Sequence, residues 1–193
     1  MGKHFGDLSK TDSALLLFKQ VAPIAKRHNY REEMKHILNG IALVYYIIGK
    51  YDKALECYFE AVELKKQEDD KLGLSVTFNN IGLVYQNLKD YDKALTYFNQ
   101  SLELKNNIKS KFDLDILLFN IGQCYSFIGN FEEAKRYVNK GFSVCVDCPE
   151  DSRVVGFQTL GYVAFFEKNY NEAKKNSVKL ISSAKIPVTN NFC

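Results

Sequence analysis

Two stretches decide the fold of this chain: Asn79-Asn80-Ile81-Gly82-Leu83-Val84-Tyr85 and, shortly after, Lys89-Asp90-Tyr91-Asp92-Lys93-Ala94-Leu95. They are typical of the end of one helix, a tight turn and the start of a second helix. The turn and the second helix recur, and the aromatic residues that open the copies are Tyr51, Tyr91, Phe131 and Tyr170. These positions are 40, 40 and 39 residues apart. A fixed period in this range predicts stacked helical hairpins rather than one closed core.

From residue 31 onward, two kinds of predicted helix alternate along the chain. The first helices of the hairpins, called A helices here, are expected at about 31–48, 71–88, 111–128 and 151–168. The second helices, called B helices, are expected at about 52–68, 92–107, 132–145 and 170–184. The turns inside the hairpins are Gly49-Lys50, Lys89-Asp90, Gly129-Asn130 and Lys168-Asn169. Connections this short predict antiparallel neighbours.

The two ends of the chain depart from this alternation. Residues 1–11 carry no periodic pattern and are expected to be a flexible lead. Residues 12–28 are expected to form a half repeat, a B helix that Asp12 would cap and that Pro23 would kink. The expected array therefore covers residues 12–184, with repeats at about 31–68, 71–107, 111–145 and 151–184, followed by a tail at 185–193.

Small residues recur at fixed places in the repeats. One place on the A helices holds Ala42, Gly82, Gly122 and Gly161, and one place on the B helices holds Ala54, Ala94, Ala134 and Ala173. Small side chains let two helix backbones approach closely. Large aromatic residues surround these places and are expected to fill the space between neighbouring helices, namely Tyr45, Tyr58, Tyr85, Phe98 and Tyr125.

The pattern resembles that of the tetratricopeptide repeat family. The family places Leu-Gly on helix A, a Tyr three residues after that Gly, then an aromatic residue, an Ala and a second aromatic residue on helix B. Here Ile81-Gly82, Tyr85, Tyr91, Ala94 and Phe98 match it. The helix A Trp of the family is absent, because the chain has no Trp. The period near 40 is similar to the long repeats of kinesin light chain, the Leu-Gly-Asn spindle adaptor and Rap-type regulators. The resemblance implies an all-α, right-handed superhelical solenoid that binds proteins or peptides.

Composition and charge exclude several classes of function. The net charge is only +3, from 26 basic and 23 acidic side chains, so no concentrated basic footprint for nucleic acid is expected. No apolar stretch is long enough for a signal peptide or a membrane span, and we expect no membrane partner. The five cysteines are odd in number and need not form a disulfide framework, which favours a cytoplasmic location.

No arrangement typical of an enzyme or a metal site is present in the sequence. The three histidines, His4, His28 and His36, have neither metal-ligand spacing nor a neighbouring nucleophile. Cys145-x-x-Cys148 is the one redox-like or metal-like spacing, but no second pair accompanies it, so the segment is interpreted as a helix end before Pro149. We therefore expect no catalysis, no metal and no cofactor.

The concave wall of such an array is built mainly from A helices, and the faces of these helices that do not contact B helices are the candidate binding surface. Asn80 and Asn120 both lie two residues before the small Gly, and an amide can donate to and accept from the backbone of an extended peptide. The wall carries no repeated Lys or Arg, so an acidic chaperone C-terminus is not an expected ligand. The predicted groove residues are Asn39, Leu43, Tyr46, Asn79, Asn80, Leu83, Asn87, Asn120, Gln123, Phe127, Gln158, Tyr162 and Phe166, with Ile47, Phe119 and Phe165 as further candidates.

The sequence thus predicts a scaffold module whose groove binds an extended peptide or a partner protein. The alternative is a sensor or regulatory segment of a larger bacterial signalling protein or transcriptional regulator. The structural interpretation also stays open, because Asn side chains at these places can bridge helices and aromatic residues can belong to the core. The predicted array has no polar capping helix, which favours a segment of a longer array; the alternatives are a tail that folds back at Ile186-Pro187-Val188 and a homo-oligomer formed through the array ends.

Overall fold

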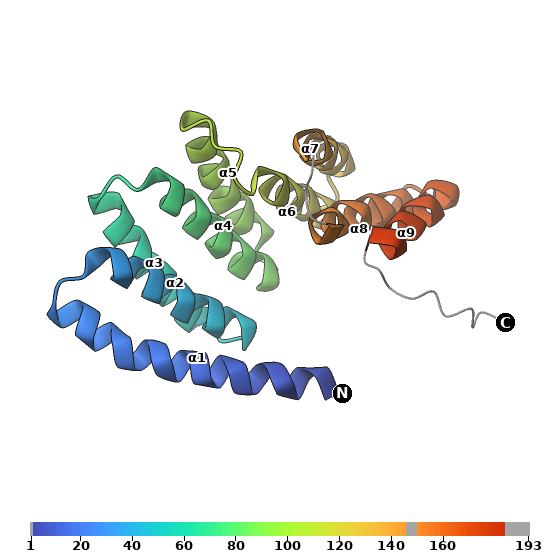
Figure 1. Cartoon of the computed structure of the whole chain (residues 1–193). Coiled ribbons are helices and arrows are strands. Elements are labelled where there is room, and N and C mark those ends of the chain that lie inside the picture. The colour runs from blue at the N-terminus through green and yellow to red at the C-terminus, as the bar shows by residue number, and fades with distance from the viewer. Residues whose placement is uncertain (1, 146–149, 184–193) are drawn as a thin grey trace. The chain divides into compact units, whose positions relative to one another are not determined.

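The computed structural model describes residues 2–145 and 150–183, and within these residues it contains nine α-helices and no strand (Figure 1). The helices are α1 (Gly2–Arg27), α2 (Arg31–Ile47), α3 (Tyr51–Gln67), α4 (Lys71–Asn87), α5 (Tyr91–Asn107), α6 (Leu114–Phe127), α7 (Phe131–Val144), α8 (Glu150–Phe166) and α9 (Tyr170–Ser183). The predicted all-α fold class and the alternation of A and B helices are confirmed.

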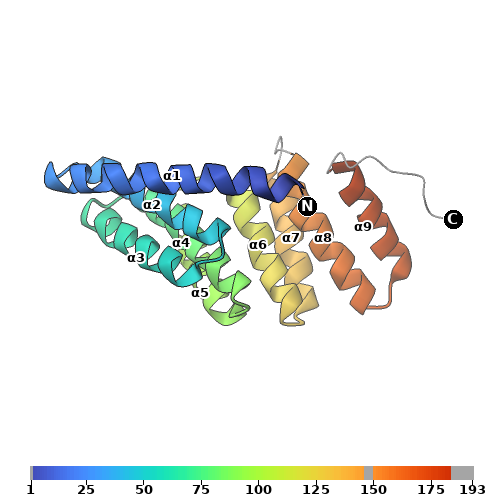
Figure 2. The same ribbon diagram turned by 90° about the horizontal axis from the view of Figure 1, so that it is seen from below.

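The chain forms two compact units, one ending at Asp90 and the other beginning at Tyr91. In the first unit, α2 packs against both α1 and α3, and α3 packs against α4. In the second unit, α6 packs against α5, α7 and α8, while α8 also packs against α7 and α9. Figure 2 shows α6, α7, α8 and α9 side by side. Each unit therefore has the helix-on-helix packing of a repeat array, in which an A helix contacts the B helices before and after it.

The small residues predicted to allow close packing lie where helices meet. Ala54, Ala94 and Ala134 are fully buried. At Gly122 on α6, a Cβ atom would come within 2.7 Å of Val138 Cγ2 and 3.0 Å of the Ala134 carbonyl oxygen on α7. The backbones of α6 and α7 are thus held closer than any larger residue at position 122 would permit.

The turns between helices have a common backbone conformation. Gly49, Lys89, Gly129 and Lys168, which are the first residues of the predicted hairpin turns, all have positive φ angles, and so do Asn29, Asp69 and Lys109 in the turns between repeats. In the first hairpin turn, the Gly49 N–H donates to the Tyr46 carbonyl and the Lys50 N–H donates to the Tyr45 carbonyl. The left-handed conformation of Gly49 thus allows two carbonyl groups in the last turn of α2 to accept hydrogen bonds, and the helix ends there.

Two boundaries differ from the prediction. Helix α1 begins at Gly2, so residues predicted as a flexible lead are helical, and position 12, predicted as a cap, lies inside the helix. Helix α6 begins at Leu114 rather than near 111, because Asp113 has a φ of 49°, a left-handed conformation that cannot belong to the helix. The predicted tail at 185–193 lies outside the described residues.

Two buried lysines connect consecutive repeats. Lys65, near the end of α3, donates to Thr77 Oγ1 at 2.6 Å and to the Gly73 carbonyl at 3.3 Å, both on α4. Lys105, forty positions later near the end of α5, donates to the Phe112 carbonyl at 2.5 Å, just before α6. Each lysine therefore joins a B helix to the start of the next A helix within the same unit.

Candidate functional site

The clearest groove that contains predicted site residues lies between α6 and α8. It is a cavity of about 150 Å³, lined by Gln123, Ser126 and Phe127 on α6 and by Gln158, Thr159 and Tyr162 on α8. Gln123, Phe127, Gln158 and Tyr162 are four of the thirteen predicted groove residues, and the structure brings them together. We call this cavity the α6/α8 groove.

The lining of the α6/α8 groove is neutral. The Ser126 hydroxyl donates to the Gln123 carbonyl at 2.7 Å, and the Thr159 hydroxyl donates to the Val155 carbonyl at 2.8 Å, so both hydroxyl protons are used within their own helices. The walls also carry the side-chain amides of Gln123 and Gln158 and the hydroxyl of Tyr162, and the rings of Phe127 and Tyr162 supply apolar surface. Such a lining can contact both the backbone and an apolar side chain of a ligand, and it offers no charged group to pair with an ionic one.

Exposed aromatic rings continue from the groove toward the end of α8. We call Phe127, Tyr162, Phe165, Phe166 and Tyr170 the aromatic ridge. Ring centroids are 5.9 Å apart between Phe127 and Tyr162, 4.5 Å between Tyr162 and Phe166, and 6.0 Å between Phe165 and Tyr170. The exposed fractions of the five residues run from 38% to 61%. A connected apolar surface of this kind is typical of an interaction site rather than of scattered surface residues.

Predicted residues of the first unit lie on α2 and α4. The Asn87 side-chain N–H donates to the Tyr46 hydroxyl at 2.9 Å and to the Leu83 carbonyl at 2.9 Å, so this amide bridges the two helices. Burial raises the pKa of the Tyr46 hydroxyl, against the opposing effect of the hydrogen bond from Asn87. Leu43 and Ile47 are about half exposed beside them. Thr77 Oγ1 lies 3.4 Å from Asn39 Oδ1, a second polar link between α2 and α4.

Other predicted residues are less accessible than expected. Phe119 is fully buried and Asn120 is 5% exposed, so both belong to the interior of the second unit instead of presenting a side chain to a ligand. Asn79, Asn80 and Leu83 are half-buried on α4. Asn80 and Asn120, predicted to present two amides at equivalent positions, therefore differ in exposure. Asn120 lies among buried neighbours on α6, whereas Asn80 on α4 is partly exposed.

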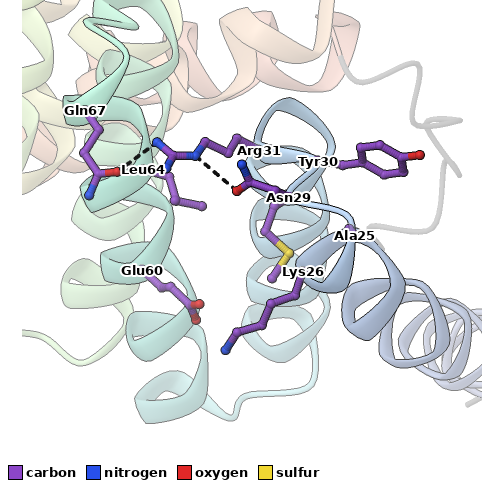
Figure 3. Close-up of a pocket in the computed structure, with 9 residues that line it drawn as sticks. Ala25, Lys26, Asn29, Tyr30, Arg31, Glu60, Leu64 and Gln67 are labelled. Atoms are coloured by element: carbon purple, nitrogen blue, oxygen red, sulfur yellow. Dashed lines mark hydrogen bonds between the residues drawn. The ribbon is translucent and has the colours of Figure 1, made fainter.

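A second cavity, which the sequence did not indicate, lies between α1, α2 and α3. Its volume is about 190 Å³, and Figure 3 shows its lining residues. Arg31 is held there by two amide oxygens: its Nε donates to Asn29 Oδ1 at 3.3 Å and its Nη1 donates to Gln67 Oε1 at 3.5 Å. Lys26 and Glu60 extend toward each other on the other side of the cavity in Figure 3. These residues come from three different helices and one turn, so no local sequence motif predicts the cavity.

The buried lysines were also missed, since Lys in a helix usually faces solvent. Burial lowers the pKa of Lys65 to about 8 and also lowers the pKa of Lys105. The available signal was their spacing of forty residues, which equals the repeat period.

The described residues hold no group of three or more His, Cys, Asp or Glu side chains that could bind a metal ion. Of the Cys-x-x-Cys pair, Cys145 caps the end of α7, as the predicted helix end requires, and is disulfide-bonded, which the sequence interpretation did not expect. Cys148 and Pro149 lie outside the described residues. Among the helices that are described, none is long and apolar enough to cross a membrane.

Comparison with known proteins places the repeats in a family. The model of the family described as "Tetratricopeptide repeat" matches residues 33–107 and 74–145, more than half of the chain. No curated protein matches the chain in sequence.

Solved structures with a similar fold are numerous, and three illustrate the range. The apo form of RapI has a TM-score of 0.71 at 16% identity, covering 94% of this chain and 79% of that one. Aspartyl phosphate phosphatase F from Bacillus subtilis has a TM-score of 0.72 at 16% identity, and although 93% of this chain is covered, the match spans only 57% of the phosphatase. A putative kinesin light chain of Podosopora anserina with nearly identical TPR-like repeats has a TM-score of 0.70 at 13% identity, covering 94% and 90% of the two chains. At these identities the likeness shows the fold alone.

Proposed function

Because this chain belongs to the tetratricopeptide repeat family, we propose that it is a binding module without catalytic activity, and that its α6/α8 groove holds an extended segment of a partner protein. The observation that carries this proposal is the groove itself: four residues predicted from sequence line one cavity, and the exposed aromatic ridge continues from it.

The chemistry of the groove defines the segment it would accept. Two amide side chains on opposite walls suit the N–H and C=O groups of an extended backbone. The rings of Phe127 and Tyr162 suit an aliphatic, aromatic or proline side chain. No charged residue lines the cavity, so an acidic or basic side chain would lose its hydration there without an ionic partner. The expected ligand is therefore a neutral segment rich in apolar residues, and neither nucleic acid nor a membrane surface fits this site.

A random peptide library displayed on phage tests the proposal. Selection on the purified chain is expected to enrich neutral, apolar peptides, and a synthetic copy of an enriched peptide is expected to bind measurably by calorimetry. Phe127→Ala should weaken this binding about tenfold or more, because truncating a central aromatic contact typically costs 2 kcal/mol or more.

Phe112→Ala is the matched control, because Phe112 is an exposed aromatic residue of the same unit that does not line the groove. An equal loss of affinity in the two variants, or enrichment of charged peptides only, would contradict the proposal.

The alternative function, a regulatory segment of a larger signalling protein, is supported by one observation. The chain spans 57% of the length of the phosphatase that it matches, so a relative can carry a further region beyond the matched one. The groove proposal applies to either case, because it concerns only what the described residues can bind.

Self-association is a further part of the proposal. Helix α1 exposes Leu16, Leu17, Val21 and Ile24, which supply apolar surface for a second copy. Sedimentation of the wild-type chain and of the Leu17→Lys variant tests for a dimer formed through this surface. A wild-type dimer that is lost in the variant supports the proposal, and a wild-type chain that is monomeric at all concentrations rejects it.

A further inference from the structure

A polar cleft of about 270 Å³ lies among α7, α8 and α9. Its floor is apolar and comes from Leu160, Val163 and Ala164 on α8. These residues follow helical spacing on the side of α8 opposite to Gln158 and Tyr162, so the cleft is separate from the α6/α8 groove. We call it the α7–α9 cleft.

The wall of the cleft carries a buried residue with a side-chain amide. Asn176 on α9 lines the cleft and is 2% exposed. It packs opposite Gly161, whose added Cβ atom would lie 3.8 Å from the Asn176 Cβ. No hydrogen bond among the described residues engages the Asn176 amide. Asn176 is not among the fully enclosed polar groups without a partner, so its amide is open to the cleft, where an occupant can form hydrogen bonds with it.

The charges around the cleft are unbalanced toward acid. Lys135 Nζ lies 2.7 Å from Glu167 Oε1 and 2.9 Å from Glu132 Oε1, so one ammonium group serves two carboxylates. Glu172, on the α9 side, lies 3.7 Å from the ammonium group of Lys175, which is exposed. The lining of the cleft therefore holds two carboxylates, Glu167 and Glu172, and one ammonium group, Lys135, and the amide oxygens of Asn139 and Asn176 add further acceptors.

We propose that the α7–α9 cleft binds an alkylguanidinium group. The Asn176 and Glu172 oxygens accept hydrogen bonds from its N–H groups, and the apolar floor contacts its methylene stem. A guanidinium group presents five donors in a plane and is weakly hydrated, so it suits a half-apolar cleft with several acceptors better than an ammonium group does. The ligand is either a free guanidine or the arginine side chain of a partner. This site does not depend on the peptide groove.

Calorimetry tests whether the cleft requires a positively charged ligand. It compares n-butylguanidine with n-butylurea, a neutral analogue of the same shape. The wild-type chain is expected to bind butylguanidine saturably and about tenfold more tightly than butylurea, because a hydrogen bond between charged groups is stronger than one between neutral groups. Equal affinity for both compounds, or no saturable binding of butylguanidine, overturns the proposal. N-acetyl-arginine methylamide distinguishes the sources: binding tighter than that of butylguanidine assigns the site to a partner's arginine, and weaker binding assigns it to a free guanidine.

Two variants locate the binding. Asn176→Leu is expected to abolish butylguanidine binding, because it removes the amide oxygen that accepts from the guanidinium group and leaves an apolar side chain of similar size in its place. Glu172→Gln keeps the shape of the side chain and is expected to weaken binding about tenfold, which covers the case in which Asn176→Leu does not fold. Lys140→Ala, on the exposed side of α7, is the control that should bind as the wild type does. Wild-type affinity in Glu172→Gln would overturn the assignment, whatever the first variant shows.

Discussion

At the scale of single residues, the glycines of the A helices have different roles although they occupy one place in the repeat. A Cβ atom at Gly122 would come within 2.7 Å of Val138 and 3.0 Å of the Ala134 carbonyl oxygen, whereas a Cβ atom at Gly161 would lie 3.8 Å from the Asn176 Cβ, an ordinary van der Waals contact. The first glycine is required by the contact between α6 and α7, and the second is not required by its surroundings.

This difference predicts the effect of one methyl group at each position. Gly122→Ala should lower the free energy of unfolding by about 1–3 kcal/mol, the usual cost of overpacking, because a backbone atom of α7 cannot move aside. Gly161→Ala should leave it unchanged or raise it slightly, because alanine stabilises helices relative to glycine. Urea unfolding of both variants makes the comparison, and equal effects would show that the packing at Gly122 is not the cause.

Lys65 is the residue whose charge state should affect stability most directly. Burial lowers its pKa from the ordinary 10.5 to about 8, so the folded chain binds fewer protons than the unfolded chain between these two values. Stability from this residue is therefore reduced below pH 8 and rises as the pH increases from about 8 to 10.5. Burial also raises the pKa of Tyr58 and Cys124, and these groups act in the opposite direction at high pH.

The contribution of Lys65 is isolated by comparison with Lys65→Met. The free energy of unfolding of the wild type, relative to this variant, should rise by about 1–2 kcal/mol between about pH 7.5 and pH 9.5. Lys66→Met, at an exposed neighbour paired with Glu63, should show no such trend. Denaturant unfolding at several pH values gives the answer, and a difference that stays constant with pH would mean that the ammonium group is not buried in solution.

At the scale of elements, the sequence predicted the helices well where a turn residue marked their ends. Lys89-Asp90 and Gly129-Asn130 were recognisable turns, and the helices around them begin and end within about two residues of the prediction. Helix α1 was missed in its first part because residues 1–11 lack apolar periodicity, which is the signal used to find helices. The start of α6 was missed because the left-handed conformation of Asp113 has no strong sequence marker.

The turns themselves yield a prediction at this scale. Gly129 has a φ of +81°, and no atom lies within 4 Å of an added Cβ, so any effect of substitution comes from backbone strain alone. Gly129→Ala should lower the free energy of unfolding by about 1 kcal/mol. Gly129→Asn should lower it by less, because Asn tolerates the left-handed conformation. Thermal unfolding of the two variants tests this prediction, and a lower melting temperature for Gly129→Asn than for Gly129→Ala would contradict it.

At the scale of the whole molecule, the repeat period predicted the fold far better than it predicted the residues that would contact a ligand. The forty-residue spacing requires only that small and aromatic residues recur, and these dictate how helices pack. Exposure of individual side chains depends on neighbours from other helices, which is why Asn120 and Phe119 were placed on the surface although they are buried. Gln123, Phe127, Gln158 and Tyr162 were found because helical spacing alone sets them on the free faces of two A helices.

The central claim is that the α6/α8 groove is the binding surface, and NMR spectroscopy tests it most directly. A peptide selected from the phage library is titrated into the ¹⁵N-labelled chain, and the side-chain amide signals of Gln123 and Gln158 are followed. The account predicts that both signals shift saturably and that the Asn176 amide signal does not. Shifts confined to other parts of the chain, with Gln123 and Gln158 unmoved at saturation, would contradict it.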